Sequence, residues 1–194
     1  PKIHGGILGR RDIPEHNETM KNHEIDPIDL VVVNLYPFEE TIRQKGCSLE
    51  LAIENIDIGG PAMIRSAAKN YQHVAILTNP NDYKSFTDEI EQNQGSISLD
   101  FSFSLAKKAF GRTAAYDLAI NNYLTSDDQN QFPVQLTKTI NKVMDLRYGE
   151  NPHQEAAFYK DSNEDIGSLS SFDQIQGKEL SFNNLNDSDT AWEC

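Results

Sequence analysis

The chain has 194 residues, 38% of them hydrophobic, and a formal net charge of −13. This length suits one ordinary domain or one domain and part of another, with enough apolar residues for a core. The negative charge argues against general binding to nucleic acid or to anionic membranes, but it allows a local positive pocket for a phosphorylated metabolite. No apolar run reaches membrane-spanning length, and the two cysteines lack metal or disulfide spacing, which fits a reducing compartment.

The first part of the chain is glycine-rich and polar. It does not begin with Met, and we interpret it as the middle of a longer protein. Residues 2–11 predict a loop or a short extended segment. Their basic side chains could line a phosphate site, and a solvated loop is an equal alternative. One short helix is expected near residues 15–22.

Residues 30–35 form a continuous, mostly β-branched run, which predicts a strand buried on both faces as in a parallel sheet. Asn34 lies at the carboxyl end of this run and Tyr36 follows it. In open α/β sheets ligands bind beyond the carboxyl ends of the strands, so both residues are site candidates. Taken singly, each is better explained as a turn residue or a packed surface side chain.

Helices and a second strand alternate along the next ninety residues. We expect helices at 48–54, 61–69 and 100–123, a strand at 74–77, and a helix that starts from residues 79–82 and ends near 91. Ser48 is a plausible N-cap and Asn70 a plausible stop. This order predicts an α/β domain.

Residues 56–61 read Ile-Asp-Ile-Gly-Gly-Pro. Two glycines followed by proline predict a sharp turn into a helix with Pro61 at its first position. Such a helix start offers free N–H groups to an anion. Asp57 precedes the turn and Lys69 lies near the end of the same helix, so the unit could hold an anionic substrate. On spacing alone, a simple turn with Asp57 as a turn residue is favoured.

After a polar linker at 127–135 the character of the chain changes. Residues 136–194 are interpreted as the start of a second domain, with a strand near 156–159 and a helix from about 188. Dense polar motifs occupy residues 146–154 and 177–187. About sixty residues would make only a thin core alone.

Five motifs together resemble one family, the bifunctional purine-synthesis proteins that join an AICAR (phosphoribosylaminoimidazolecarboxamide) formyltransferase to an IMP cyclohydrolase. They are Val33 to Phe38, Asn55 to Gly60, Ala67 to Asn70, Leu146 to Gln154 and Gly177 to Asp187. The resemblance covers nearly the whole chain.

The resemblance implies a domain layout. Residues 1–126 would be a cyclohydrolase domain with a methylglyoxal-synthase-like parallel sheet flanked by helices, without its first strands and phosphate-binding loops. Residues 127–135 would be the linker. Residues 136–194 would begin an α/β formyltransferase domain whose Lys-His pair follows later, so the chain given could be inactive by itself.

The resemblance also implies the activity: formyl transfer from the cosubstrate 10-formyltetrahydrofolate to AICAR, then cyclisation of formyl-AICAR to IMP with loss of water. No metal, nucleic acid or membrane takes part. The family implies a cytoplasmic homodimer whose ligands are AICAR, formyl-AICAR and IMP.

Four side chains match catalytic positions of the family. Lys69 matches a proton donor and acceptor, and burial of its ammonium would favour the neutral form. Asp57 matches the carboxylate that orients the amide and helps its nitrogen lose a proton, and it is expected opposite Lys69. Asn34 and Tyr36 match pocket residues near the purine ring and the oxyanion.

Further residues match substrate contacts. Backbone contacts to the cyclisation substrate are implied for Val33, Ile58, Gly59 and Gly60. In the second part, Arg147 and Tyr148 match a pair that binds AICAR, and the planar guanidinium of Arg147 suits a phosphate. A surface salt bridge is the alternative for Arg147. The asparagines at 183 and 184 could form a network that holds turns.

Two other functions stay open on the sequence. One is a non-catalytic regulatory module of the same fold that binds a phosphorylated metabolite. The other is an interaction segment in which the Gly-Gly-Pro turn is purely structural. The combination of Asp57, Lys69, Asn34 and Tyr36 favours the enzyme.

Overall fold

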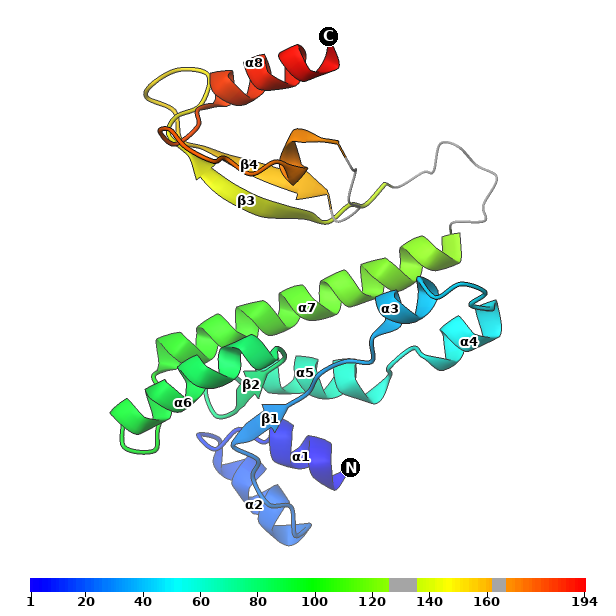
Figure 1. Ribbon diagram of the computed structural model, residues 1–194. Helices are drawn as coiled ribbons and strands as arrows, with labels where there is room; N and C mark the ends of the chain where they lie inside the picture. The colour runs from blue at the N-terminus through cyan, green and yellow to red at the C-terminus, as the bar shows by residue number, and fades with distance from the viewer. Residues whose placement is uncertain (126–135, 162–166) are drawn as a thin grey trace. The chain divides into compact units, whose positions relative to one another are not determined.

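The computed structural model describes residues 1–125, 136–161 and 167–194. The chain divides into two compact units, Pro1–Gln131 and Phe132–Cys194 (Figure 1). The expected linker 127–135 lies outside the described residues. No helix in the described part is long and apolar enough to cross a membrane.

The first unit alternates helices with two short strands (Figure 1). In chain order its elements are α1 (Lys2–Leu8), α2 (Pro14–Asn22), β1 (Leu30–Val32), α3 (Phe38–Ile42), α4 (Leu49–Glu54), α5 (Gly59–Lys69), β2 (Ala75–Leu77), the 3-10 helix η1 (Pro80–Asp82), α6 (Tyr83–Gln92) and α7 (Leu99–Thr125).

β1 and β2 form a parallel pair, with Val31 opposite Ile76. All three residues of β2 are buried, as predicted. The prediction for β1 is wrong, because Leu30 is 40% and Val32 47% exposed while Val31 is buried. Side chains alternate between the faces of a strand, so Leu30 and Val32 share the exposed face and Val31 lies on the face that is packed against the core.

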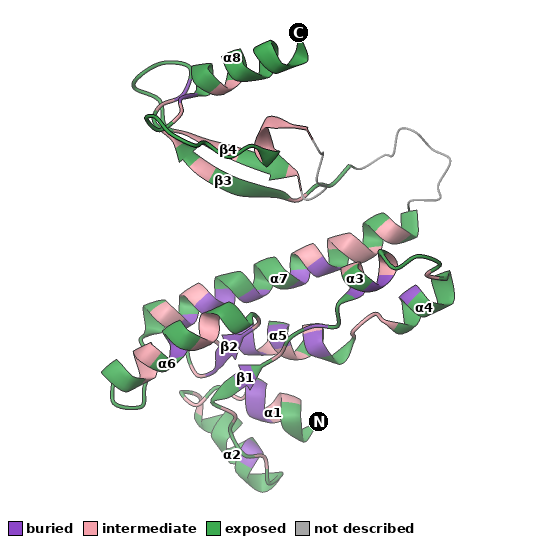
Figure 2. Ribbon diagram, viewed as in Figure 1, coloured by how far each residue is buried: buried purple, intermediate pink, exposed green. Residues whose placement is uncertain are grey.

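The long helix α7 organises the core of this unit. It packs against α5, β2 and α3, and buried residues recur along one of its faces (Figure 2). These residues are Ser102, Leu105, Ala106, Ala109, Thr113 and Tyr116. Burial of this apolar face is the main source of stability for such a helix. The core is completed by β2 and by the buried face of α5.

Residues 2–11 contain a helix, α1, so the prediction of a loop there is wrong. Glycine disfavours helix by about 1 kcal/mol relative to alanine, which is why the sequence suggested a loop. In the structure the segment 25–28 lies directly against the glycines of α1. A Cβ on Gly6 would overlap the carbonyl oxygen of Asp26, and Ile28 donates its N–H to the Gly6 carbonyl at 3.1 Å. Close packing therefore outweighs propensity.

Most other helix predictions are confirmed. Ser48 caps α4 by accepting the N–H of Leu51 at 3.2 Å, and Asn79 caps η1 through the N–H of Asn81 at 2.9 Å. Asn70 is the C-cap of α5. That helix begins at Gly59, two residues before the predicted start at Pro61. Proline is still tolerated there because the first-turn N–H groups have no partner within the helix.

The second unit contains an antiparallel strand pair and a helix. β3 (Ile140–Leu146) pairs with β4 (Ala156–Asp161), and η2 (Leu169–Ser171) and α8 (Phe182–Glu193) follow. The strand predicted near 156–159 is confirmed. The helix starts six residues before the predicted 188, because Ser181 and Asn184 form a capping box at its start.

Candidate functional site

The turn before α5 is held by the Asp57 carboxylate. Oδ1 accepts the N–H of Gly60 at 2.7 Å, and Oδ2 accepts the N–H of Tyr36 at 3.4 Å. One side chain therefore joins the helix start to the segment that follows β1. Asp57 acts as an anionic cap at the N-terminus of α5. The N-terminus is the positive end of the helix dipole, where a negative charge is favourable.

Tyr116 of α7 supports the same turn from the core. Its hydroxyl accepts the N–H of Asp57 at 2.8 Å and donates to the Asn55 carbonyl at 3.4 Å. Tyr116 is 2% exposed, and burial raises the pKa of its hydroxyl, so the group stays protonated and able to donate. Sequence reasoning missed Tyr116. The available signal was a tyrosine three residues after Thr113 on the apolar face of a long helix.

The two glycines of the turn have different surroundings. A Cβ on Gly60 would lie 2.5 Å from Oδ2 of Asp57 and 2.8 Å from Cδ2 of Leu35, distances that real Cβ contacts do not reach. A Cβ on Gly59 would meet nothing within 4 Å. Gly60 therefore lets Asp57 and Leu35 close over the helix start, whereas Gly59 faces open space where a ligand can approach its backbone.

Asn34 and Tyr36 follow the carboxyl end of β1, as the sequence predicted. The Asn34 amide donates to the Tyr83 hydroxyl at 3.0 Å, and both Asn34 and the Tyr36 side chain are exposed. Val33 continues the sheet by donating its N–H to Leu77 at 3.0 Å. At this end of β1 the Asp57 carboxylate joins the backbones of Tyr36 and Gly60, and Asn34, two residues before Tyr36, bonds to Tyr83.

Lys69 lies elsewhere. It is the last residue of α5, and the ten residues from Gly59 correspond to a rise of about 15 Å along the helix axis. Its side chain is exposed. The side chain of Lys69 is therefore not buried, and α5 lies between Asp57 and Lys69, so the expectation that the two residues face each other across one pocket stays a prediction.

Arg147 and Tyr148 in the second unit touch each other. The guanidinium of Arg147 lies 4.8 Å from the centroid of the Tyr148 ring, and its Nη2 donates to the Tyr148 hydroxyl at 3.2 Å. Their backbones form hydrogen bonds with the residues around the start of α8. The N–H of Arg147 donates to the carbonyl of Leu180 at 2.8 Å, and the carbonyl of Tyr148 accepts the N–H of Phe182 at 3.1 Å. Arg147 makes no ion pair with a described residue, so the salt-bridge alternative finds no partner there.

The asparagine pair in the second unit is structural in this chain. Asn184 Oδ1 accepts the N–H of Ser181 at 3.1 Å in the capping box, and Asn183 donates its amide to the Glu150 carbonyl at 3.2 Å. The prediction of a network that holds turns is confirmed for these two residues.

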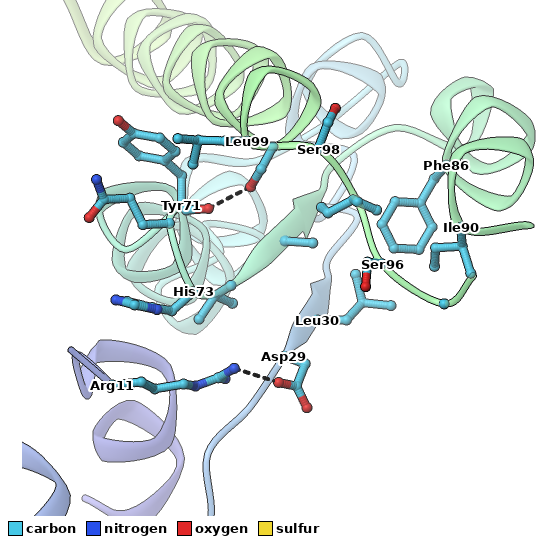
Figure 3. A pocket seen from close by; sticks show the side chains of 16 residues that line it. Arg11, Asp29, Leu30, Tyr71, His73, Phe86, Ile90, Ser96, Ser98 and Leu99 are labelled. Carbon is cyan, nitrogen blue, oxygen red and sulfur yellow. Dashed lines mark hydrogen bonds and ion pairs between the residues drawn. The ribbon is translucent and has the colours of Figure 1, made fainter. Parts of the chain in front are cut away.

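A separate hollow of about 480 Å³ lies at the opposite, amino ends of β1 and β2 (Figure 3). Several of its polar groups are paired, but Nε of Arg11 is buried without a partner among the described residues. Arg11 binds Asp29 at 2.7 Å, and the Ser102 hydroxyl donates to the Tyr71 carbonyl at 2.6 Å. Of the basic side chains in residues 2–11 that could line a phosphate site, Arg11 lines this hollow. Among the described residues no cluster of His, Cys, Asp and Glu could hold a metal ion.

The fold and the site thus define an α/β protein with a polar region at the carboxyl end of a parallel strand, closed by a Gly-Gly helix start. Residues 67–194 match the family model described as "AICARFT/IMPCHase bienzyme", and residues 2–62 match the model of the MGS-like domain. The chain belongs to the AICARFT/IMPCHase bienzyme family. The predicted fold, an MGS-like parallel sheet with helices and the start of a second domain, is confirmed.

Individual relatives agree with the family. The chain is 57% identical to the bifunctional purine biosynthesis protein PurH of Neisseria meningitidis serogroup A, over the whole chain and 38% of that protein. It is 57% identical to PurH of Neisseria gonorrhoeae, over the whole chain and 39% of that protein. The chain therefore spans about two fifths of these relatives. A solved structure, "Crystal structure of ForH", is similar at 34% identity and a TM-score of 0.59, over 66% of each chain.

Proposed function

We propose that the protein containing this chain carries out formyl transfer from 10-formyltetrahydrofolate to AICAR and cyclisation of formyl-AICAR to IMP. Family membership and the names of the relatives support this assignment. The observation that carries it is the Asp57 carboxylate, which ties the helix start at Gly60 to the backbone of Tyr36.

In the proposed cyclisation, the carboxamide nitrogen of formyl-AICAR attacks the formyl carbon, and water leaves. Asp57 orients the amide and helps its nitrogen lose a proton, while Asn34 and Tyr36 border the purine ring and the oxyanion. An amide donor next to a developing oxyanion stabilises it in the transition state. Backbone contacts come from Val33, Ile58, Gly59 and Gly60.

Lys69 keeps its proposed role as a proton donor and acceptor on the strength of the resemblance alone. Lys69 lies about 15 Å from Gly59 along α5, and its direct pair with Asp57 stays a prediction. The variant Lys69→Ala tests whether Lys69 takes part in cyclisation. Nearly complete loss of cyclisation with formyl transfer intact supports the role, and unchanged cyclisation removes it.

In the second unit we propose that Arg147 and Tyr148 bind AICAR for formyl transfer. The exposed guanidinium, stacked on the Tyr148 ring and without an ion pair among the described residues, is available to a phosphate. The proposed boundaries are residues 1–126 for the cyclohydrolase domain, 127–135 for the linker and 136–194 for the start of the formyltransferase domain. The proposed assembly is a cytoplasmic homodimer.

The decisive experiment measures both half-reactions with purified full-length protein. The variant Asp57→Asn removes the charge but keeps a carbonyl oxygen at the turn, and we expect cyclisation to fall about 100-fold while formyl transfer is unchanged. A regulatory module would instead bind IMP in calorimetry and turn over nothing. Absence of IMP formation by the wild-type protein would refute the proposed function.

A further inference from the structure

The carboxyl ends of β1 and β2 lie at the same edge of the sheet, because the two strands are parallel. Asn34 follows β1, and Tyr83 is the first residue of α6, which the chain reaches from β2 through η1. The amide nitrogen of Asn34 donates to the hydroxyl oxygen of Tyr83 at 3.0 Å. The two side chains therefore meet at the edge where ligands bind in open α/β sheets.

Tyr83 is held in place by the core and by α7. Its half-buried ring packs against the core cluster, which also contains the buried Phe86 of the same helix. Asp82, the residue before Tyr83, forms an ion pair with Lys108 of α7, and the Asp82 side chain is only 14% exposed. Asn79 caps η1 and so stabilises the turn that leads to Tyr83. The Tyr83 hydroxyl thus has a fixed position at this edge.

Asn34 has no such support of its own. It lies beyond the end of β1 and is exposed. Among the described residues, the hydrogen bond to Tyr83 is the one bond that its side chain makes. An asparagine side chain without a partner samples several rotamers. The bond to Tyr83 selects one of them. It uses one of the two amide protons, and because the amide group is planar it also fixes the direction of the second proton.

We propose that Tyr83 is a positioning residue for ring closure: its hydroxyl holds the Asn34 amide so that the second amide proton is presented to the formyl oxygen. This inference rests on the proposed cyclisation of formyl-AICAR, in which Asn34 borders the oxyanion. Tyr83 acts through Asn34 and not on the substrate.

The step explains why a fixed amide is useful. As the carboxamide nitrogen gives up its proton with the help of Asp57 and bonds to the formyl carbon, the carbonyl π electrons move to the formyl oxygen. The negative charge on this oxygen develops only in the transition state. A donor that is already oriented stabilises the charge without having to reorganise during the reaction.

The test measures both half-reactions with the purified full-length protein. Tyr83→Phe keeps the ring and removes only the hydroxyl. We expect kcat for cyclisation to fall about 10-fold with KM nearly unchanged, because an interaction made in the transition state is weakened. Tyr71→Phe is the matched control and should keep the wild-type kcat. Tyr71 is also half-buried and packed against the core, but it lines the hollow at the amino ends of the strands.

A double variant shows whether Tyr83 acts through Asn34. Asn34→Ala should lower kcat for cyclisation about 100-fold, as the loss of an oxyanion donor does. Adding Tyr83→Phe to Asn34→Ala should change kcat no further, because the amide that the hydroxyl holds is already gone. Formyl transfer should be equal in the wild type and in all of these variants, which shows that each of them is folded.

Either of two results would overturn the positioning role. The first is a Tyr83→Phe enzyme whose kcat for cyclisation lies within twofold of wild type. The second is a double variant about 10-fold slower than Asn34→Ala, which would mean that the hydroxyl acts independently of Asn34. If Asp57→Asn is impaired while Tyr83→Phe is not, the proposed function stands without Tyr83. A wild-type protein that forms no IMP would refute the proposed function, and this inference with it.

Discussion

The main-chain N–H of Asp57 donates to the hydroxyl of Tyr116 at 2.8 Å, across 59 residues of sequence. This bond ties the turn that begins α5 to the buried face of α7. The side chain of Asp57 is then free to hold Gly60 and Tyr36. The position of the proposed catalytic carboxylate is thus fixed from the core and not by the loop alone.

The variant Tyr116→Phe tests this support. It leaves the N–H of Asp57 and the carbonyl of Asn55 without their partner, and an unpaired, partly buried group costs about 1–3 kcal/mol. We expect the free energy of unfolding in urea to fall by that amount, and cyclisation to slow because Asp57 loses its fixed position. Tyr159→Phe in the second unit is the control. Equal stability of the two variants would contradict the proposed support.

The glycine pair gives a matched comparison within one turn. A methyl group at Gly60 would overlap the Asp57 carboxylate and Leu35, so Gly60→Ala should lower the free energy of unfolding by about 1–3 kcal/mol. Gly59→Ala adds a methyl group in open space at a helix start, and it should leave stability equal or slightly higher. Urea denaturation of both variants checks the order, and the reverse order would show that the turn is not closed over Gly60.

Local patterns predicted the elements, and tertiary contacts account for what they missed. The Asn34 position could be read from a polar residue at the end of a β-branched run. Its partner Tyr83 could not, since 49 residues separate them. The helix α1 was not predicted because its glycines disfavour a helix locally. They are needed there because the segment 25–28, distant in sequence, packs closely against them. The Asp57 turn could be predicted from the sequence, but the start of α5 at Gly59, which sets the length of helix before Lys69, could not.

Stability at acid pH should depend on Asp12. Its carboxylate accepts hydrogen bonds from Arg10 and His73, and the Arg10 bond is the larger cause of its lowered pKa. A depressed carboxyl pKa stabilises the fold above the unfolded value, near 3.9, and the benefit is lost as pH falls below that toward the folded value. Asp12→Asn should therefore lower Tm at pH 7, and its difference from wild type should shrink below about pH 4.

Thermal denaturation from pH 2 to pH 7 measures that difference. Asp88→Asn is the control, because Asp88 forms an exposed pair with Lys84 one turn away on α6, the kind of ion pair that contributes little to stability. A Tm difference for Asp12→Asn that stays constant across the whole pH range would exclude the ionised carboxylate as its cause.

Arg147 provides the test for the second unit. Removing its guanidinium in Arg147→Ala should raise KM for AICAR in formyl transfer about 10- to 100-fold, since a charge-assisted bond to a phosphate contributes about 1.5–3 kcal/mol. Cyclisation should not change. Arg147→Lys keeps the charge but loses the planar guanidinium and its stacking on Tyr148, so its KM for AICAR should lie between those of the wild type and Arg147→Ala. A KM for Arg147→Ala equal to wild type would mean that the exposed guanidinium serves only to pack against Tyr148.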